Sequence, residues 1–373
     1  MSTVTTIMPV FDSKLKEARD YWIKKLSREI EPSTLRTDFD RPADETSEAQ
    51  TFRVTLPEDL SHKLARLTGD SPFLLYTALM AALKVCLHKY TGSDLIVVGS
   101  PARRKENDST PAVNALAVVD ELDSRVTFRK FLMSVRENLV EAYAHQGYPF
   151  ERVLRDLSLR HVANGCALFD VALVLGNIHG PMPEVRNGIT FTFLKTPQAI
   201  TGDVQYNSNI FREETIKRFT SHFLHLLSAA LDNIDASIGN LEILTPEEHR
   251  QQLYEWNETR AEYPRELCVH ELFETQAART PHAPALVFDD EQVSYAELNA
   301  RSNQLAHYLR RLGVAPETRI AIMMERSIEM VVAVLGILKA GAAYLPLDPS
   351  YPQERLAFML DDAQLSLLLT QQR

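Results

Sequence analysis

The sequence has 373 residues and a formal net charge of −10. This length predicts two or three domains, and no apolar run approaches the ~18 residues of a membrane span. Residues 201–300 hold 18 acidic and 7 basic side chains, the opposite of the basic stripe of a nucleic-acid-binding protein. The sequence therefore predicts neither a membrane nor a nucleic-acid partner.

Two further features bear on the compartment. The N-terminus lacks the basic and apolar regions of a signal peptide. The three cysteines, Cys86, Cys166 and Cys268, are odd in number and far apart, which favours neither a disulfide framework nor a zinc site. We therefore expect a reducing, cytoplasmic location.

Helices and strands are predicted to alternate through the first two thirds of the chain, which indicates an α/β or α+β fold. A helix capped by Ser13 is expected up to Leu26, because its apolar residues recur at helical spacing. Later helices are predicted to begin at Pro57 and Pro72, and over 128–145 and 213–234. The strands are expected at 51–56, 95–98, 112–122, 168–175, 189–195 and 203–209.

A boundary is predicted near 256–267, where a polar segment with Pro264 lies inside the acidic window. Beyond it a new alternation begins, with helices over 269–278, 295–312 and 328–340 and strands over 285–288, 293–295, 320–323 and 343–347. One more helix and strand precede Arg373. The acidic run Asp289–Glu291 favours a hairpin turn over a cation site.

One motif of the first part starts where a predicted helix ends, at His145, Gln146, Tyr148, Pro149, Phe150 and Glu151. Pro149 blocks continuation of the preceding helix, and the two aromatic residues are expected to anchor a turn in the core. His145 could act as an acid or base, since its unperturbed pKa of ~6.5 suits that role, although no second catalytic residue is adjacent. Arg155 and Asp156 favour a structural ion pair or cap over a catalytic pair.

The second part carries two motifs. Val293–Leu298 contains Tyr295 and Glu297, and Leu338–Pro349 contains Lys339, Gly341, Tyr344 and Asp348. Gly341 is expected to end a helix at positive φ, and Pro346 and Pro349 to stop the strand that follows. These residues indicate a scaffold, because no nucleophile and no phosphate-binding loop is among them.

Together these motifs resemble a nonribosomal peptide synthetase over nearly the whole chain. Residues 1–256 resemble the C-terminal half of a condensation domain, in which Asn114 stands in a degraded form of a Gly-x-Phe-Val-Asn-Thr motif. Residues 257–267 resemble the linker, and residues 268–373 resemble the N-terminal start of an adenylation domain. The resemblance implies a chloramphenicol-acetyltransferase-like lobe, followed by a partial N-terminal subdomain of the adenylate-forming type.

The family's catalytic motifs are not found in this sequence. It has no His-His-x-x-x-Asp-Gly, no glycine after Gly341 for a phosphate loop, and no other catalytic signature. His222 and His225 share one face of a predicted helix, yet no carboxylate or cysteine joins them at metal-ligand spacing, so no metal is expected. The basic triplet Arg103–Lys105 does not suffice for a nucleic-acid site.

These observations lead to the hypothesis of a truncated segment of a cytoplasmic, peptide-antibiotic-producing synthetase, inactive by itself and without catalytic residues. The resemblance implies that its parent uses ATP, Mg²⁺ and phosphopantetheine on a separate carrier domain, none bound by this chain. The implied partners are carrier domains and a missing N-terminal condensation lobe. Two alternatives remain: a non-catalytic module that docks a carrier domain or complements that lobe in trans, and an active stand-alone acyltransferase.

Overall fold

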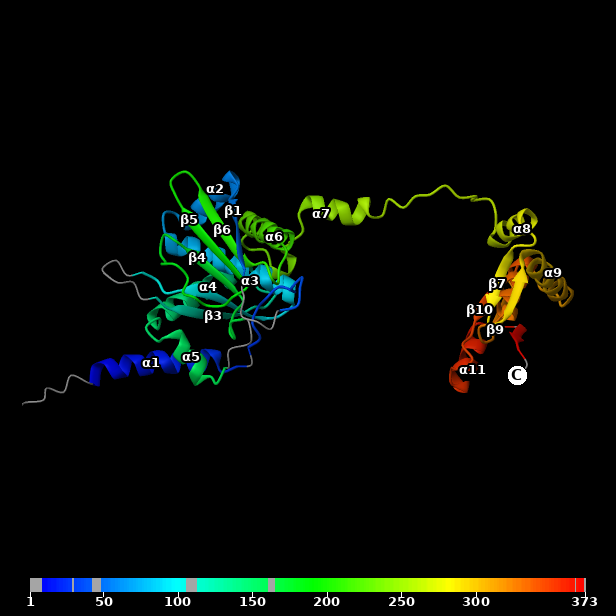
Figure 1. Cartoon of the computed structure of the whole chain (residues 1–373), viewed down its shortest axis with the longest axis horizontal. Coiled ribbons are helices and arrows are strands. Elements are labelled where there is room, and N and C mark those ends of the chain that lie inside the picture. Colours follow the sequence, from blue (N-terminus) through cyan, green and yellow to red (C-terminus); the bar gives the residue numbers. More distant parts are fainter. Residues whose placement is uncertain are drawn as a thin grey trace, which may run out of the picture. The chain divides into compact units, whose positions relative to one another are not determined.

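The computed structural model describes residues 9–28, 30–41, 48–104, 113–159, 165–365 and 367–371. The chain divides into two compact units, Met1–Glu258 and Thr259–Arg373 (Figure 1). Each unit mixes helices and strands, as the sequence predicts, and each is described by itself.

The first unit is built on a six-stranded sheet with the order β1-β6-β5-β4-β2-β3. Strand β5 pairs with β4 in parallel, β2 meets β4 in parallel at Gly99 and Ala172, and the other neighbours are antiparallel. The strands are β1 (Ala49–Thr55), β2 (Leu95–Pro101), β3 (Ala115–Glu121), β4 (Val171–Leu175), β5 (Ile189–Lys195) and β6 (Ile200–Asn207).

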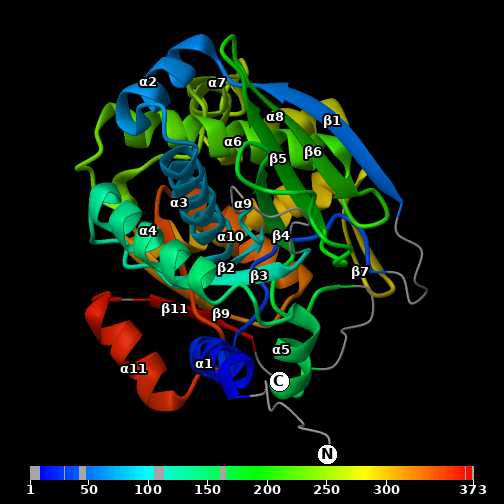
Figure 2. The ribbon, with the colours of Figure 1, turned by 90° about the vertical axis from the view of Figure 1, so that its left-hand side faces the viewer.

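Four helices form a layer against this sheet: α2 (Glu58–Thr68), α3 (Pro72–Thr91), α4 (Phe128–Ala144) and α6 (Glu213–Asp232). Helix α3 lies between α4 and α6 and also contacts β2 and β4 (Figure 2). It is buried almost throughout its length, because its sequence is apolar on every side. Ser71 caps its first turn, and Gly92 ends it in the left-handed conformation.

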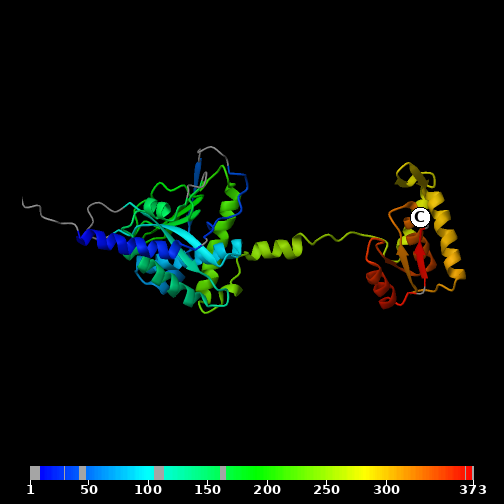
Figure 3. The same cartoon turned by 90° about the horizontal axis from the view of Figure 1, so that it is seen from below.

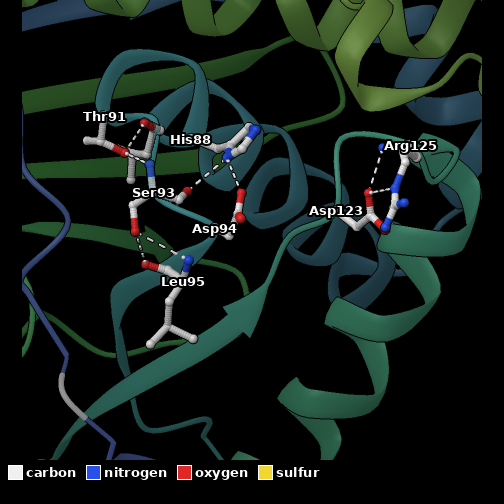
Figure 4. Close-up of polar contacts among 8 residues, drawn as sticks. His88, Thr91, Ser93, Asp94, Leu95, Asp123 and Arg125 are labelled. Atoms are coloured by element: carbon white, nitrogen blue, oxygen red, sulfur yellow. Dashed lines mark hydrogen bonds and ion pairs between the residues drawn. The ribbon is translucent and has the colours of Figure 1, made fainter.

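The turn from α3 into β2 is held by short-range polar contacts (Figure 4). The backbone N–H of Ser93 donates to Thr91 Oγ1, and the Ser93 carbonyl lies 2.8 Å from His88 Nδ1. In the connection between β3 and α4, Asp123 accepts hydrogen bonds from the backbone N–H and the guanidinium of Arg125. These contacts hold the chain just before β2 and just after β3.

Strand β4 is buried at every position, and the segment before β1 is hydrogen-bonded to this part of the sheet. Ser33 Oγ accepts a hydrogen bond from the Val97 N–H on β2. The buried carboxylate of Asp170, at the start of β4, accepts from Thr34, from Arg41 and from the Gly188 N–H. An added Cβ at Gly188 would lie 2.9 Å from Asp170 Oδ2, so any other residue there would displace this hydrogen-bonded carboxylate.

Helix α1 (Pro9–Leu26) and the short helix α5 (Phe150–Asp156) contact each other. After α6 the first unit ends with a 3₁₀ turn (Ile238–Asn240), helix α7 (Pro246–Arg250) and one π-helical turn (Gln251–Glu255). No single described helix is long and apolar enough to cross a membrane; α2 and α3 pass only as a pair, and they are bent by 117°.

The second unit combines a parallel sheet of order β10-β9-β11 with a hairpin of β7 and β8. Helices α9 and α11 lie on opposite sides of the three-stranded sheet (Figure 3). Its elements are α8 (Val269–Arg279), β7 (Pro284–Phe288), β8 (Glu291–Ser294), α9 (Tyr295–Arg311), β9 (Arg319–Met323), α10 (Ile328–Ala340), β10 (Ala343–Pro346), α11 (Gln353–Asp362) and β11 (Leu367–Thr370).

Several local predictions are confirmed. Asp289 and Asp290 form the two-residue turn between β7 and β8, with Asp289 at φ 49°. Gly341 ends α10 at φ 87°, and β10 stops at Pro346.

Four local features differ from the predictions. Ser13 is not the cap of the first helix, because α1 begins at Pro9 and Ser13 lies within it. The strand expected from 168 begins at Val171, and the one expected from 112 begins at Ala115, with residue 112 outside the described residues. The sequence did not predict helix α5, because this helix is only about two turns long and begins directly after Pro149.

Candidate functional site

The loop between α4 and α5 carries the motif that starts at His145. His145 is the residue that ends α4, and Pro149 directly precedes α5, so the loop is closed between two helix ends. Phe150 is buried, with its ring centroid 5.6 Å from that of Phe169. Glu151 and Arg155 are exposed on α5.

Asn114 fixes the backbone of this loop from the start of β3. Its amide nitrogen donates to the carbonyls of Gln146 (2.9 Å) and Tyr148 (2.8 Å), and its amide oxygen accepts from the Phe150 N–H (2.9 Å). A single side chain therefore satisfies three backbone groups that a turn leaves unpaired.

Gln146 makes a second clamp on the same loop. Its side chain is buried, accepts from the Arg103 N–H at 2.7 Å and donates to the Arg103 carbonyl at 3.2 Å. The Arg103 guanidinium lies over the Phe73 ring, 5.3 Å from the centroid. Arg103 and Arg104 are exposed, and Lys105 lies outside the described residues.

Asp156 joins the loop to α1. It accepts hydrogen bonds from the Tyr148 hydroxyl and from Arg19 Nε, both at 2.7 Å. The Tyr148 hydrogen bond, followed by Arg19, holds the pKa of Asp156 below its usual value. The ion pair of Asp156 is thus made with Arg19, which is distant in sequence, and not with its neighbour Arg155 as the sequence suggested.

His145 is held by its own helix and by α1. Its Nδ1 lies 2.8 Å from the Glu141 carbonyl, and since a carbonyl only accepts, Nδ1 carries the proton. The imidazole stacks on the Tyr21 ring, with 4.2 Å between the ring centroids. The backbone carbonyl of His145 accepts a hydrogen bond from Trp22 Nε1. Among the described residues, the ring has no carboxylate partner of the kind that activates a catalytic histidine.

A groove of about 630 Å³ lies between α1, β3 and α4, with His145 at its wall. Two ion pairs join its basic and acidic sides: Arg28 NH1 to Glu121 Oε2 at 3.1 Å, and Lys25 Nζ to Glu141 Oε2 at 3.5 Å. Its lining residues are Tyr21, Lys24, Lys25, Arg28, Leu95, Val119, Glu121, Ser134, Asn138, Glu141 and His145.

Beneath this groove lies a buried ion pair that the sequence analysis missed. Lys84 and Asp120 are in contact, both with fully buried side chains, and Lys84 Nζ also donates to the Val118 carbonyl at 2.7 Å. Asn138 donates to Asp120 and accepts from Lys25. Burial lowers the pKa of Lys84, and Asp120 opposes that shift.

A second buried polar chain runs between α3, α4 and β2. Leu175 N–H donates to His179 Nδ1 at 3.1 Å, so the other nitrogen, Nε2, carries the proton and donates to the Tyr143 hydroxyl at 2.8 Å. The Tyr143 hydroxyl is in turn hydrogen-bonded to Ser100 Oγ, which also accepts a hydrogen bond from the Tyr76 hydroxyl. Burial, aided by the charges of Arg103 and Arg104, lowers the pKa of His179 to about 3.

Of the predicted histidine pair, His222 is buried and acquires a carboxylate partner. Its Nε2 lies 2.9 and 2.8 Å from the two oxygens of Glu248, and its Nδ1 lies 2.7 Å from the Tyr90 hydroxyl. His225 has no part in these contacts. Within the described part of the chain, no group of three or more His, Cys, Asp or Glu side chains is placed to hold a metal.

In the second unit, Lys339 connects three helices. Its Nζ contacts Asn299 and lies 2.7 Å from Asn303 Oδ1 on α9, and 3.0 Å from Glu274 Oε1 on α8. The ammonium also lies over the Phe273 ring, 5.3 Å from the centroid. Lys339 is thus a buried structural side chain.

The other motif residues of this unit serve local structure. Tyr295 donates its N–H to the Ala283 carbonyl, and Glu297 is paired with Arg301 one helical turn later. The Asp348 carboxylate accepts a hydrogen bond from the Ser350 N–H at 2.9 Å, and this bond lowers the pKa of Asp348. Tyr344 is exposed and borders a groove.

That groove has a volume of about 830 Å³ and a mostly apolar lining. It lies along α8 and α10, and its lining residues are Leu267, Cys268, Val269, His270, Phe273, Ala285, Leu286, Tyr295, Leu298, Val331, Val334, Leu335, Leu338, Gly341, Ala342 and Tyr344. This lining contains no lysine or arginine, whereas sites that bind nucleotide phosphates combine backbone N–H groups with a cation.

Comparison with protein families assigns the two parts of the chain. The model described as "Condensation domain" matches residues 12–189 and 182–253. The model described as "AMP-binding enzyme" matches residues 273–373.

Curated relatives match over almost the whole chain. Bacitracin synthase 1 of Bacillus licheniformis is 35% identical over 375 residues, and gramicidin S synthase 2 of Aneurinibacillus migulanus is 36% identical over 380. The matches cover 95% and 96% of this chain but only 7% and 8% of those synthetases. The chain therefore spans less than a tenth of either relative.

A similar fold is found in solved structures. A four-domain nonribosomal peptide synthetase, the holo-AB3403 structure bound to AMP and glycine, matches with a TM-score of 0.79 at 23% identity, over 98% of this chain and 30% of that one. The X-domain from teicoplanin biosynthesis, in complex with OxyB, matches with a TM-score of 0.56 at 20% identity, over 63% of this chain and 57% of that one. The chain belongs to the nonribosomal peptide synthetase family, with a condensation-domain fold followed by part of an AMP-binding domain.

Proposed function

We propose that this chain is a condensation–adenylation junction that serves a synthetase module without catalysing either reaction itself. Residues 1–256 would act as the C-terminal condensation lobe, residues 257–267 as the linker, and residues 268–373 as the N-terminal portion of the adenylation domain. The order of the two family matches, 12–253 and then 273–373, supports this arrangement.

One observation carries the proposal: the family-motif side chains are committed to structure. Asn114 and Gln146 hold backbone groups, and Lys339 joins three helices. His145 is hydrogen-bonded to its own helix and stacked on Tyr21. The 373-residue sequence also contains no adjacent histidines and no Asp-Gly pair, so the family's condensation motif has no counterpart here.

Activation of an amino acid would require groups that face ATP phosphates. No glycine follows Gly341 in the sequence. Of the two grooves in the described residues, the one in the first unit has no glycine in its lining, and the one in the second unit has no lysine or arginine. We infer that ATP, Mg²⁺ and the phosphopantetheine of a carrier domain are used by the parent enzyme at sites outside these residues. Carrier domains would be its working partners.

A condensation assay tests the proposal directly. The purified full chain is mixed with one carrier domain loaded with an acyl group and another loaded with an aminoacyl group, and the dipeptidyl product is measured by mass spectrometry. We expect no product above that of the loaded carriers alone. Product formation by this chain would overturn the proposal.

A second role is favoured by the core of the first unit. One continuous apolar cluster, with the half-buried side chains packed against it, connects helices α1 to α6 with all six strands, as expected of a unit that could fold by itself and complement an N-terminal condensation lobe in trans. Adding a separately expressed N-terminal lobe to the assay tests this role. Product that appears only when both proteins are present would support complementation, and its absence at saturating lobe would exclude it.

A further inference from the structure

The end of the first unit is held to its body by one polar contact. Among the described residues, the hydrogen bonds from α7 to elements outside the 245–255 segment are those between Glu248 and His222 of α6. No residue of α7 is buried, and none of the following π-helical turn is. The segment 246–255 therefore has little apolar packing to keep it in place, and Figure 1 shows α7 extending away from α6.

The contact itself is built into the protein. The His222 side chain is 5% exposed, and Glu248 is 26% exposed. The Tyr90 hydroxyl lies 2.7 Å from His222 Nδ1, so this hydroxyl can donate to Nδ1 while Nε2–H donates to the carboxylate. Tyr90 thereby orients the ring toward Glu248, and a hydrogen bond to a charged acceptor is stronger than a neutral one.

Glu248 has two structural roles at once. It completes the capping box of α7, accepting from the Thr245 N–H at 2.9 Å, while its own N–H donates to Thr245 Oγ1. Partial burial alone would raise the pKa of Glu248, but the Thr245 N–H and His222 lower it below its usual value. The carboxylate therefore keeps its charge at neutral pH, and helix formation and attachment depend on the same group.

We propose that His222 and Glu248, with Tyr90 behind them, form a releasable latch that sets where the irregular connection after the first unit begins. With the latch closed, the irregular segment starts after Glu255. With the latch open, it gains the ten residues of α7 and the π-helical turn. For a flexible chain, whose reach grows with the square root of its length, this increases the reach of the connection that ends at residue 267 by about a third.

Trypsin cleavage after Arg250 in the full chain reports the open state. The matched variants are Glu248→Gln, which weakens the latch and retains an amide oxygen for the cap, and Glu247→Gln, which makes the same change on the exposed neighbour. We expect Glu248→Gln to speed this cleavage about tenfold, as for loss of a charged hydrogen bond, with Glu247→Gln unchanged. Cleavage after Arg260, in the linker, is the internal reference and should not change in either variant.

A double-mutant cycle separates the latch from the cap. His222→Phe removes the latch and leaves the capping box, so we expect His222→Phe with Glu248→Gln to cleave no faster than His222→Phe alone. Tyr90→Phe, at a partly exposed position, provides a second test if His222→Phe does not fold, and should speed cleavage to a smaller extent. Additive effects, or equal rates in Glu247→Gln and Glu248→Gln, would overturn the proposal. It does not depend on the proposed function.

Discussion

The two units differ in how completely they bury their strands. In the first unit, β4 is buried at every position, and one apolar cluster connects the helical layer with the sheet. In the second unit, β10 and β11 have no fully buried residue, and the core consists of two small, separate clusters. A chain that buries a larger fraction of its apolar surface is more stable, so the comparison teaches that stability is concentrated in Met1–Glu258.

The exposed apolar side chains of the second unit follow the same trend. Large side chains on its surface include Val269, Val287, Phe288, Tyr344 and Phe358, with exposed fractions from 42% to 70%. Apolar surface of this kind marks an interaction face or an aggregation-prone region. The Lys339 contacts, by contrast, give this unit a polar centre that joins α8, α9 and α10.

The largest predicted effect is a difference in protease resistance between the units. In a limited trypsin digestion of the full chain, we expect residues from about 267 onward to be lost at least about tenfold faster than the first unit, because local opening there costs less free energy. Mass spectrometry of the surviving fragment checks this. A fragment that retains 268–373 intact while the first unit is digested would contradict the comparison.

The buried pair Lys84 and Asp120 gives the next largest effect. Lys84→Met leaves the Asp120 carboxylate buried without its cation, and we expect the free energy of unfolding of the first unit to fall by about 3–5 kcal/mol. The double variant Lys84→Met with Asp120→Leu should recover most of that loss. Urea denaturation measures both, and a loss below about 1 kcal/mol for Lys84→Met would show that the pair is not buried as described.

Lys339 is the corresponding buried lysine of the second unit, and its loss should cost less. Its partner Glu274 is 44% exposed, so this carboxylate returns to water when the ammonium is removed. We expect Lys339→Met to destabilise the second unit by about 2 kcal/mol, mainly through the unpaired Asn299 and Asn303 side chains. Equal losses for Lys84→Met and Lys339→Met would remove the distinction between the two units.

His179 should give the first unit a measurable dependence on pH. Its pKa is about 3 in the folded protein and ~6.5 when unfolded, so the unfolded chain takes up a proton first as the pH falls. Stability is therefore lost between pH 6.5 and 3, with a slope approaching about 1.4 kcal/mol per pH unit.

Urea denaturation at pH 7 and pH 5, compared with the variant His179→Gln, isolates this contribution. The variant is expected to be less stable at pH 7, because the hydrogen bonds to Tyr143 and Leu175 are changed, but less sensitive to the change in pH. The same pH dependence in both proteins would show that His179 is not buried in its neutral form.

The features that the sequence predicted correctly depend on near neighbours in the chain. The hairpin turn at Asp289 and Asp290 and the left-handed Gly341 follow from residue types within a few positions. The family motifs also lie in short, contiguous stretches, and the fold class they implied is confirmed by the family matches.

The features that were missed join distant residues. Arg19 and Asp156 are 137 residues apart, Lys84 and Asp120 are 36 apart, and His222 and Glu248 are 26 apart. None of these pairs has a spacing that one helix or strand would bring together. The buried charges of Lys84 and Asp120 could only be recognised once β3 and α3 were seen side by side.

Amino-acid-dependent exchange of radiolabelled pyrophosphate into ATP tests most directly the claim that this chain does not catalyse by itself. The purified chain is assayed with Mg²⁺, ATP and each proteinogenic amino acid in turn, with a synthetase module that contains the phosphate loop as the positive control. We predict exchange no greater than the blank without amino acid for all of them. Robust exchange with any one amino acid would show that an adenylation centre is present and would contradict the account.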